Sequence, residues 1–151
     1  MKLAEALNER AHISQKLQEL KQRITQNAKH QEGDKPAEDP MVLLKEFNEC
    51  SSRFDALVVR INKTNNGIVL SNGVSLIEAL AMRESLKMKH SLYRSVASEA
   101  VPSQGRYSKS EIKFVSSVPV VDIQSQADQF AKEHRELDSK IQQSNWNHDL
   151  V

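Results

Sequence analysis

Four stretches of this chain carry apolar residues at alternating spacings of three and four, and this pattern constrains the fold more than any other feature. The first stretch covers about residues 2–28, and its apolar positions are Leu3, Ala6, Ile13, Leu17, Leu20 and Ile24. Similar stripes run through residues 43–61, 76–97 and 123–141. Such spacing places apolar side chains along one face of a helix that packs on other helices at a shallow angle. The sequence therefore predicts four amphipathic helices.

Residues that start and stop helices separate these stripes. Asp39 followed by Pro40 predicts the start of the second helix, because the N–H that proline lacks has no helical partner there. The run of residues 64–67, Thr-Asn-Asn-Gly, predicts its end, since Asn and Gly tolerate a left-handed C-cap. Ser75 and Glu78 have the spacing of a capping box and predict the start of the third helix.

Two stretches do not follow the helical pattern. Residues 68–70 are Ile-Val-Leu and could form one small strand. Residues 101–121 contain two prolines and a glycine, and within them residues 111–115 alternate polar and apolar as a half-buried strand does. Asp122 is then expected to cap the fourth helix.

The predicted fold class is mainly α. Helices of about 25 residues each would cover roughly two thirds of the chain, about twice the usual share. Matched lengths and modest connections favour four long antiparallel helices, either as a bundle or as paired helical hairpins, with a minor short β element. A chain of 151 residues and 17.1 kDa is expected to form a single helical domain over residues 1–151.

Charge and cysteine content bear on partners and compartment. The 21 Lys+Arg and 20 Asp+Glu are interleaved and give a net charge of +1, which argues against a nucleic-acid partner. A single cysteine excludes an internal disulfide framework and fits a reducing cytosol. The N-terminus has no signal-peptide pattern, and apolar runs such as residues 56–59 fall far short of the roughly 20 residues that span a bilayer. We expect a cytoplasmic protein with no membrane partner.

Two arginines interrupt the apolar stripes. On a helical wheel, Arg10 and Arg83 lie within about 35° of the centre of their stripes. A buried guanidinium needs a carboxylate or a bound anion, and Asp138 and Glu9 are the candidate carboxylates. Three roles remain open: a polar layer that fixes helix register or oligomeric state, snorkelling at a subunit interface, and a site that binds a small phosphate or carboxylate.

Cys50, His90 and His134 also occupy stripe positions. Thiolate and imidazole suit zinc, but these residues come from three predicted helices without a ligand-spacing motif. A small buried cysteine and two hydrogen-bonded core histidines are therefore favoured, and neither a metal nor a cofactor is predicted. The sequence also lacks a Gly-rich phosphate loop, a Cys-x-x-Cys pair and a nucleophile elbow, so enzyme activity stays an open question.

Several segments of the chain resemble a known family. They are MKLAEALNER at residues 1–10, QEG at 31–33, PAEDP at 36–40, RINKTN at 60–65 and RYSKSEIK at 106–113. Together they resemble the septicolysin-like family of small bacterial proteins over essentially the whole chain. The resemblance implies a mostly helical homo-oligomer, with a hexamer as one candidate, and it assigns no catalytic residue. A binding role for Arg10, Arg60, Arg106 and Tyr107 is set against capping, loop anchoring and subunit contacts, which are favoured.

Three functional hypotheses follow. The leading one is a cytoplasmic helical protein whose main activity is homo-oligomeric assembly. The alternative is a binding protein or enzyme for an anionic metabolite, with Arg10 and Arg83 as the clamp and Asp138 or Glu9 balancing the charge. The third is a membrane-active cytolysin, which the family name suggests but which the absence of a long alternating β-hairpin in the sequence disfavours.

Overall fold

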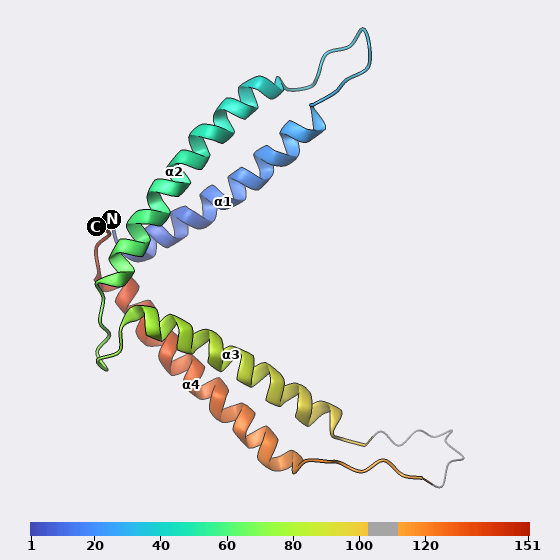
Figure 1. The fold of residues 1–151 in the computed structure, drawn as a ribbon, viewed down its shortest axis with the longest axis vertical. Coiled ribbons are helices and arrows are strands. Elements are labelled where there is room, and N and C mark those ends of the chain that lie inside the picture. The colour runs from blue at the N-terminus through green and yellow to red at the C-terminus, as the bar shows by residue number, and fades with distance from the viewer. Residues whose placement is uncertain (103–111) are drawn as a thin grey trace. The chain divides into compact units, whose positions relative to one another are not determined.

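The computed structural model describes residues 1–102 and 112–151. The described part contains four α-helices: α1 (Leu3–Gln26), α2 (Pro40–Asn66), α3 (Leu76–Glu99) and α4 (Val120–Asn147) (Figure 1). The predicted class, mainly α with four long helices, is confirmed. The chain divides into two compact units, residues 1–68 with 143–151 and residues 69–142. The expectation of a single domain stays a prediction.

In the first unit, α1 and α2 lie side by side as an antiparallel hairpin (Figure 1). Leu3, Leu20 and Ile61 are completely shielded from solvent where the two apolar stripes meet. Asp39 caps α2 as predicted, because its side chain accepts a hydrogen bond of 2.9 Å from the Met41 N–H. Burial of the stripes therefore fixes which faces of α1 and α2 meet.

Ion pairs line one edge of this hairpin. Lys16 Nζ lies 2.7 Å from Glu46 Oε1, and Arg53 Nη2 lies 3.4 Å from Glu9 Oε1. A third pair joins Arg23 to Glu38. Exposed pairs of this kind contribute little to stability but select one register of the two helices.

The last residues of the chain pack on the same unit. The Leu3 N–H donates to the His148 carbonyl, and the Leu150 N–H donates to the Met1 carbonyl, each at 2.9 Å. The Val151 N–H donates to Thr64 Oγ1 at 3.0 Å. These bonds hold the end of the chain against the start of α1 and the end of α2.

In the second unit, α3 and α4 form another antiparallel hairpin (Figure 1). A turn through Gly73, whose φ is +82°, leads into α3. Ser75 and Glu78 form the predicted capping box, since Glu78 N–H donates to Ser75 Oγ at 3.2 Å and Ser75 N–H donates to Glu78 Oε2 at 3.1 Å. The buried side chains of α3 and α4 are small near the end of α3, where Ala97 and Ala127 lie, and include larger ones near its start, where Leu76, Leu137 and Ile141 lie.

The structure corrects two predicted helix ends. Helix α4 begins at Val120 rather than after Asp122, and the Pro119 carbonyl accepts the first hydrogen bond from the Ile123 N–H at 3.0 Å. Asp122 lies in the first turn, where the positive end of the helix dipole stabilises its carboxylate. At the end of α2, Gly67 has φ −94° and does not adopt the left-handed conformation expected of it.

The minor β element differs from the expected strands. Residues 68–70 form no strand, and the β structure of the described part consists of two isolated bridges, Lys2 with Asp149 and Val69 with Ser75. Residues 112–115 are exposed and not in a strand, so their alternating pattern does not reflect a half-buried sheet face. Residue 111 lies outside the described residues. Short alternation alone cannot form a strand, and no described segment of the chain pairs with residues 112–115.

Candidate functional site

The polar residues of α3 form one row. Arg83, Lys87, His90 and Arg94 are spaced by four, three and four residues, which places them within about 60° on the helical wheel. This row faces the neighbouring helix α4 across a groove. The groove is lined from α4 by Gln124, Asp128, Ala131, His134, Arg135 and Asp138. We call this surface the polar groove.

At one end of the polar groove, Arg83 is held by carboxylates. Its Nη1 donates to Asp138 Oδ1 at 2.9 Å, and its Nη2 lies 3.5 Å from Glu84 Oε1. The groove here has a volume of about 420 Å³. Because protein carboxylates already satisfy the guanidinium, this end supports a structural role for Arg83 that joins α3 to α4.

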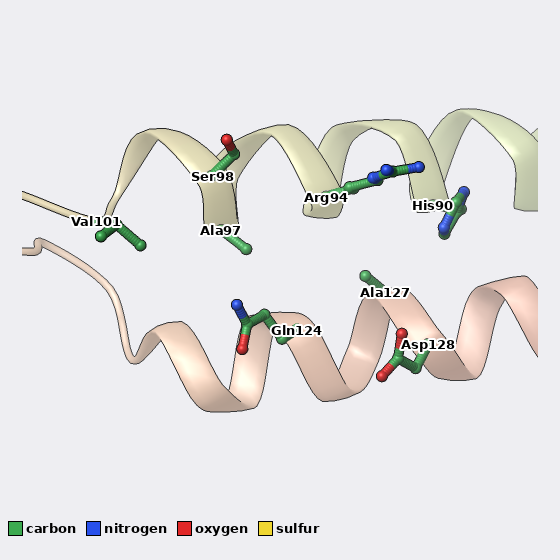
Figure 2. Close-up of a pocket in the computed structure, with 8 residues that line it drawn as sticks. All are labelled: His90, Arg94, Ala97, Ser98, Val101, Gln124, Ala127 and Asp128. Atoms are coloured by element: carbon green, nitrogen blue, oxygen red, sulfur yellow. The ribbon is translucent and has the colours of Figure 1, made fainter.

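The other end of the groove has a larger volume, about 610 Å³, and is shown in Figure 2. Its base is formed by Ala97 and Ala127, which are both buried. The Arg94 side chain extends along α3 toward His90, while Gln124 lies on α4 across from Ala97 (Figure 2). Small side chains at the base leave space between the helices, so polar groups from both helices border the same cavity.

The two arginines proposed as a clamp belong to different units of the chain. Arg10 is half-buried on α1, and no hydrogen bond or ion pair of its side chain is present in the described part of the chain. Arg83 forms an ion pair with Asp138, one of the two carboxylates that the sequence analysis suggested. Glu9, the other, pairs with Arg53 instead. A paired-arginine site therefore gains no support from these contacts.

The remaining candidates are also distributed over both units. Cys50 is buried in the first hairpin, whereas His90 and His134 line the polar groove. Among residues 1–102 and 112–151, no group of three His, Cys, Asp or Glu side chains is arranged to hold a metal ion. Arg60 Nε donates to the Val151 carbonyl at 2.9 Å, which anchors the end of the chain. Arg106 and Tyr107 lie outside the described residues.

Sequence reasoning missed three cations of the groove, Lys87, Arg94 and Arg135. The signal for the first two was available, because they continue the spacing of Arg83 and His90 along α3. Arg135 had no such signal: its place beside His134 on the groove side of α4 becomes visible once the helices are paired.

Displaced pKa values occur at ion pairs and caps outside the groove. A hydrogen bond from Lys16 lowers the pKa of Glu46, and the same contact raises the pKa of Lys16. Hydrogen bonds from Ser75 lower the pKa of Glu78 at the start of α3. Lys2 lowers the pKa of Asp149 in the same way. These exposed groups hold helix ends and edges, so their shifts indicate structural contacts rather than catalysis.

Comparison with known proteins places this architecture in a family. The model of the family of unknown function DUF6847 matches residues 10–150. The chain belongs to this family. A solved relative, described as a functionally unknown conserved protein from Corynebacterium diphtheriae, is 43% identical, with a TM-score of 0.94 over 100% of this chain and 99% of the other. No curated protein matches the chain significantly.

Membership of DUF6847 and the similarity to the solved relative thus establish the fold but assign no activity. The resemblance to the septicolysin-like family stays a prediction, as does the cytoplasmic location. No helix in the described portion of this DUF6847 member is long and apolar enough to cross a membrane.

Proposed function

We propose that this protein assembles with copies of itself through the outer face of α3. The observation that carries the proposal is a second apolar stripe on this helix, formed by Ile77, Ala81, Met88 and Leu92, which we call the outer stripe. These residues lie within about 60° on the helical wheel, roughly opposite the alanines that face α4. Ile77, Met88 and Leu92 are 50%, 67% and 61% exposed.

An exposed apolar residue by itself needs no explanation, but a row of them does. The members of the outer stripe are spaced by four, seven and four residues, the pattern by which helices pack on one another. Helix α3 thus carries one apolar stripe that contacts α4 and a second one whose large members are at least half exposed. The resemblance to the septicolysin-like family, which implies a homo-oligomer, supports the same conclusion.

The outer stripe is complementary to itself, which favours a second copy as the partner. If two α3 helices pair antiparallel about a point between residues 84 and 85, Ile77 lies opposite Leu92 of the second copy. Ala81 then lies opposite Met88, so a small side chain accommodates a long one. A two-fold pairing repeats each contact, as expected of an isologous interface.

Charges beside the outer stripe fit the same pairing. Glu78 of one copy approaches Lys89 of the other, giving an attractive contact on each side of the axis. One repulsion opposes them: the two Glu84 carboxylates approach one another at the axis, and this cost has to be exceeded by the apolar contacts.

The magnitude of the burial indicates a weak dimer unless other surfaces add to it. Full burial of a large apolar side chain contributes about 1.5–3 kcal/mol, and roughly half of that remains to be gained at each half-exposed position. Six such side chains in a pair of copies therefore give about 5–9 kcal/mol. Association costs about 4–15 kcal/mol, so the stripe alone is near balance.

Solution mass tests the proposal directly. Light scattering at protein concentrations from about 10 µM to 1 mM should give a mass above the 17.1 kDa of one chain. A Met88→Glu, Leu92→Glu variant should shift the mass toward one chain, because four carboxylates would then have to enter the interface. The control is Val59→Glu on α2, which is 50% exposed and lies outside the outer stripe.

The control should keep the wild-type mass, and circular dichroism should show unchanged helix content in all variants. A wild type that remains at 17.1 kDa throughout the range overturns the proposal. So does an oligomer whose mass responds equally to Val59→Glu and to the double substitution.

A further inference from the structure

Within residues 1–102 and 112–151, three cations of the polar groove take part in no ion pair. Arg83 takes part in ion pairs with Glu84 and Asp138, but Lys87, Arg94 and Arg135 take part in none within the described parts of the chain. Asp128 is the carboxylate that remains unpaired among the groove-lining residues of these parts. The groove therefore presents an excess of positive charge to solvent.

From this geometry we infer that the polar groove binds a small, elongated molecule carrying at least two phosphate or carboxylate groups, with Arg94 as its principal contact. A planar guanidinium can donate two parallel hydrogen bonds to either anion, whereas Lys87 acts as a point charge. Lys87 and Arg94 are seven residues apart, about 10 Å along the helix. A ligand with several anionic groups can place a separate group against each of these two cations.

The space between the helices suits a ligand of this size. The larger end measures about 610 Å³, within the range of about 300–1,000 Å³ typical of small-molecule sites. Buried Ala97 and Ala127 let ligand atoms approach the helix backbones more closely than larger side chains would. Figure 2 shows Arg94 above this base, with Gln124 and Asp128 across the groove.

The neutral and acidic groups at this end narrow the ligand class further. Ser98 and Gln124, which flank Ala97, can each donate a hydrogen bond to an anionic oxygen at that end of the cavity. Asp128 can accept one from a ligand hydroxyl or ammonium group, and it repels an anion placed directly against it. The charged groups of the ligand are thus expected along the α3 side of the groove, with any donor group toward α4.

This site is separate from the surface proposed for self-assembly. The row from Arg83 to Arg94 and the outer stripe are about 140° apart around α3. A substitution in one surface should therefore leave the other intact, and failure of one proposal leaves the other standing.

Titration calorimetry of the full chain at constant ionic strength tests the inference, with inorganic phosphate, tripolyphosphate and citrate as probes. Tripolyphosphate or citrate should bind at least about tenfold more tightly than phosphate, because each can reach more than one cation. The stronger of these two tells whether the site prefers phosphate or carboxylate groups. Arg94→Gln should weaken that binding by at least about tenfold, the usual range for losing a charge-assisted hydrogen bond.

The matched pair Lys87→Gln and Lys140→Gln controls for net charge. Both lysines are exposed on the α3–α4 hairpin, but Lys140 lies on the other side of α4 from the groove. Lys87→Gln should weaken binding by about threefold or more, and Lys140→Gln by less than about twofold. The inference is overturned if neither polyanion binds, if Arg94→Gln leaves the affinity unchanged, or if the two lysine variants weaken binding equally.

Discussion

Replacement of Asp138 by alanine removes the carboxylate that accepts a 2.9 Å hydrogen bond from Arg83. Breaking a fully buried ion pair costs about 3–5 kcal/mol, because one charge is left without water or a partner. Here the Arg83 and Asp138 side chains remain 25% and 37% exposed, and Glu84 lies 3.5 Å from the guanidinium. The guanidinium is therefore not isolated, and we expect a loss of about 1–1.5 kcal/mol in the free energy of unfolding.

The opposite replacement, Arg83→Leu, should cost less. Leucine at this position extends the apolar stripe between α3 and α4, and the Asp138 carboxylate that remains is still reached by water. We expect a change within about 1 kcal/mol. The double variant then gives a coupling free energy of about 1 kcal/mol between the two side chains, measured by urea unfolding followed by circular dichroism.

Two results would refute this reasoning. A coupling free energy below about 0.3 kcal/mol would show that the two side chains do not interact in solution. A loss above about 3 kcal/mol for Asp138→Ala would show that the pair is dry, contrary to the exposure seen in the structure. Arg83→Leu should also keep the wild-type mass in light scattering, because Arg83 lies away from the outer stripe.

Two further predictions concern the helix start and the hairpin edge. Ser75→Ala should lower the free energy of unfolding by about 1 kcal/mol, because the Glu78 N–H loses its cap. The control is Ser91→Ala, an exposed position within α3, which should change the free energy of unfolding by less than half of this. Equal effects of the two substitutions would contradict the capping assignment. The bond from Lys16 lowers the pKa of Glu46 in the folded state. Ionised Glu46 therefore stabilises the folded protein at pH values above the pKa that Glu46 has in the unfolded chain. This stabilisation is lost as the pH falls through the pKa of Glu46 in the folded state. The urea midpoints of wild type and Glu46→Gln should therefore converge between about pH 6 and pH 3 at low salt, and a constant difference would argue against the ion pair.

Local signals were read correctly where the interaction that forms is itself local. The Ser75–Glu78 capping box and the Asp39–Pro40 start of α2 each depend on groups within three residues of one another. The start of α4 was wrong because a good cap at Asp122 was preferred over Pro119, although proline is compatible with the first turn of a helix. The strand expected at residues 111–115 was wrong for 112–115, because a strand depends on a partner that no local pattern supplies.

The sequence by itself determined the number of helices and the apolar faces within each hairpin. Apolar residues repeated at the helical period of 3.6 residues lie on one face of a helix, and burial of that face stabilises the hairpin. It also indicated Asp138 as a partner for Arg83, by charge and by position on the stripe. Tertiary structure decided the rest of the groove. The two alanines that open it, Ala97 and Ala127, are 30 positions apart in the sequence and face each other because α3 and α4 pair.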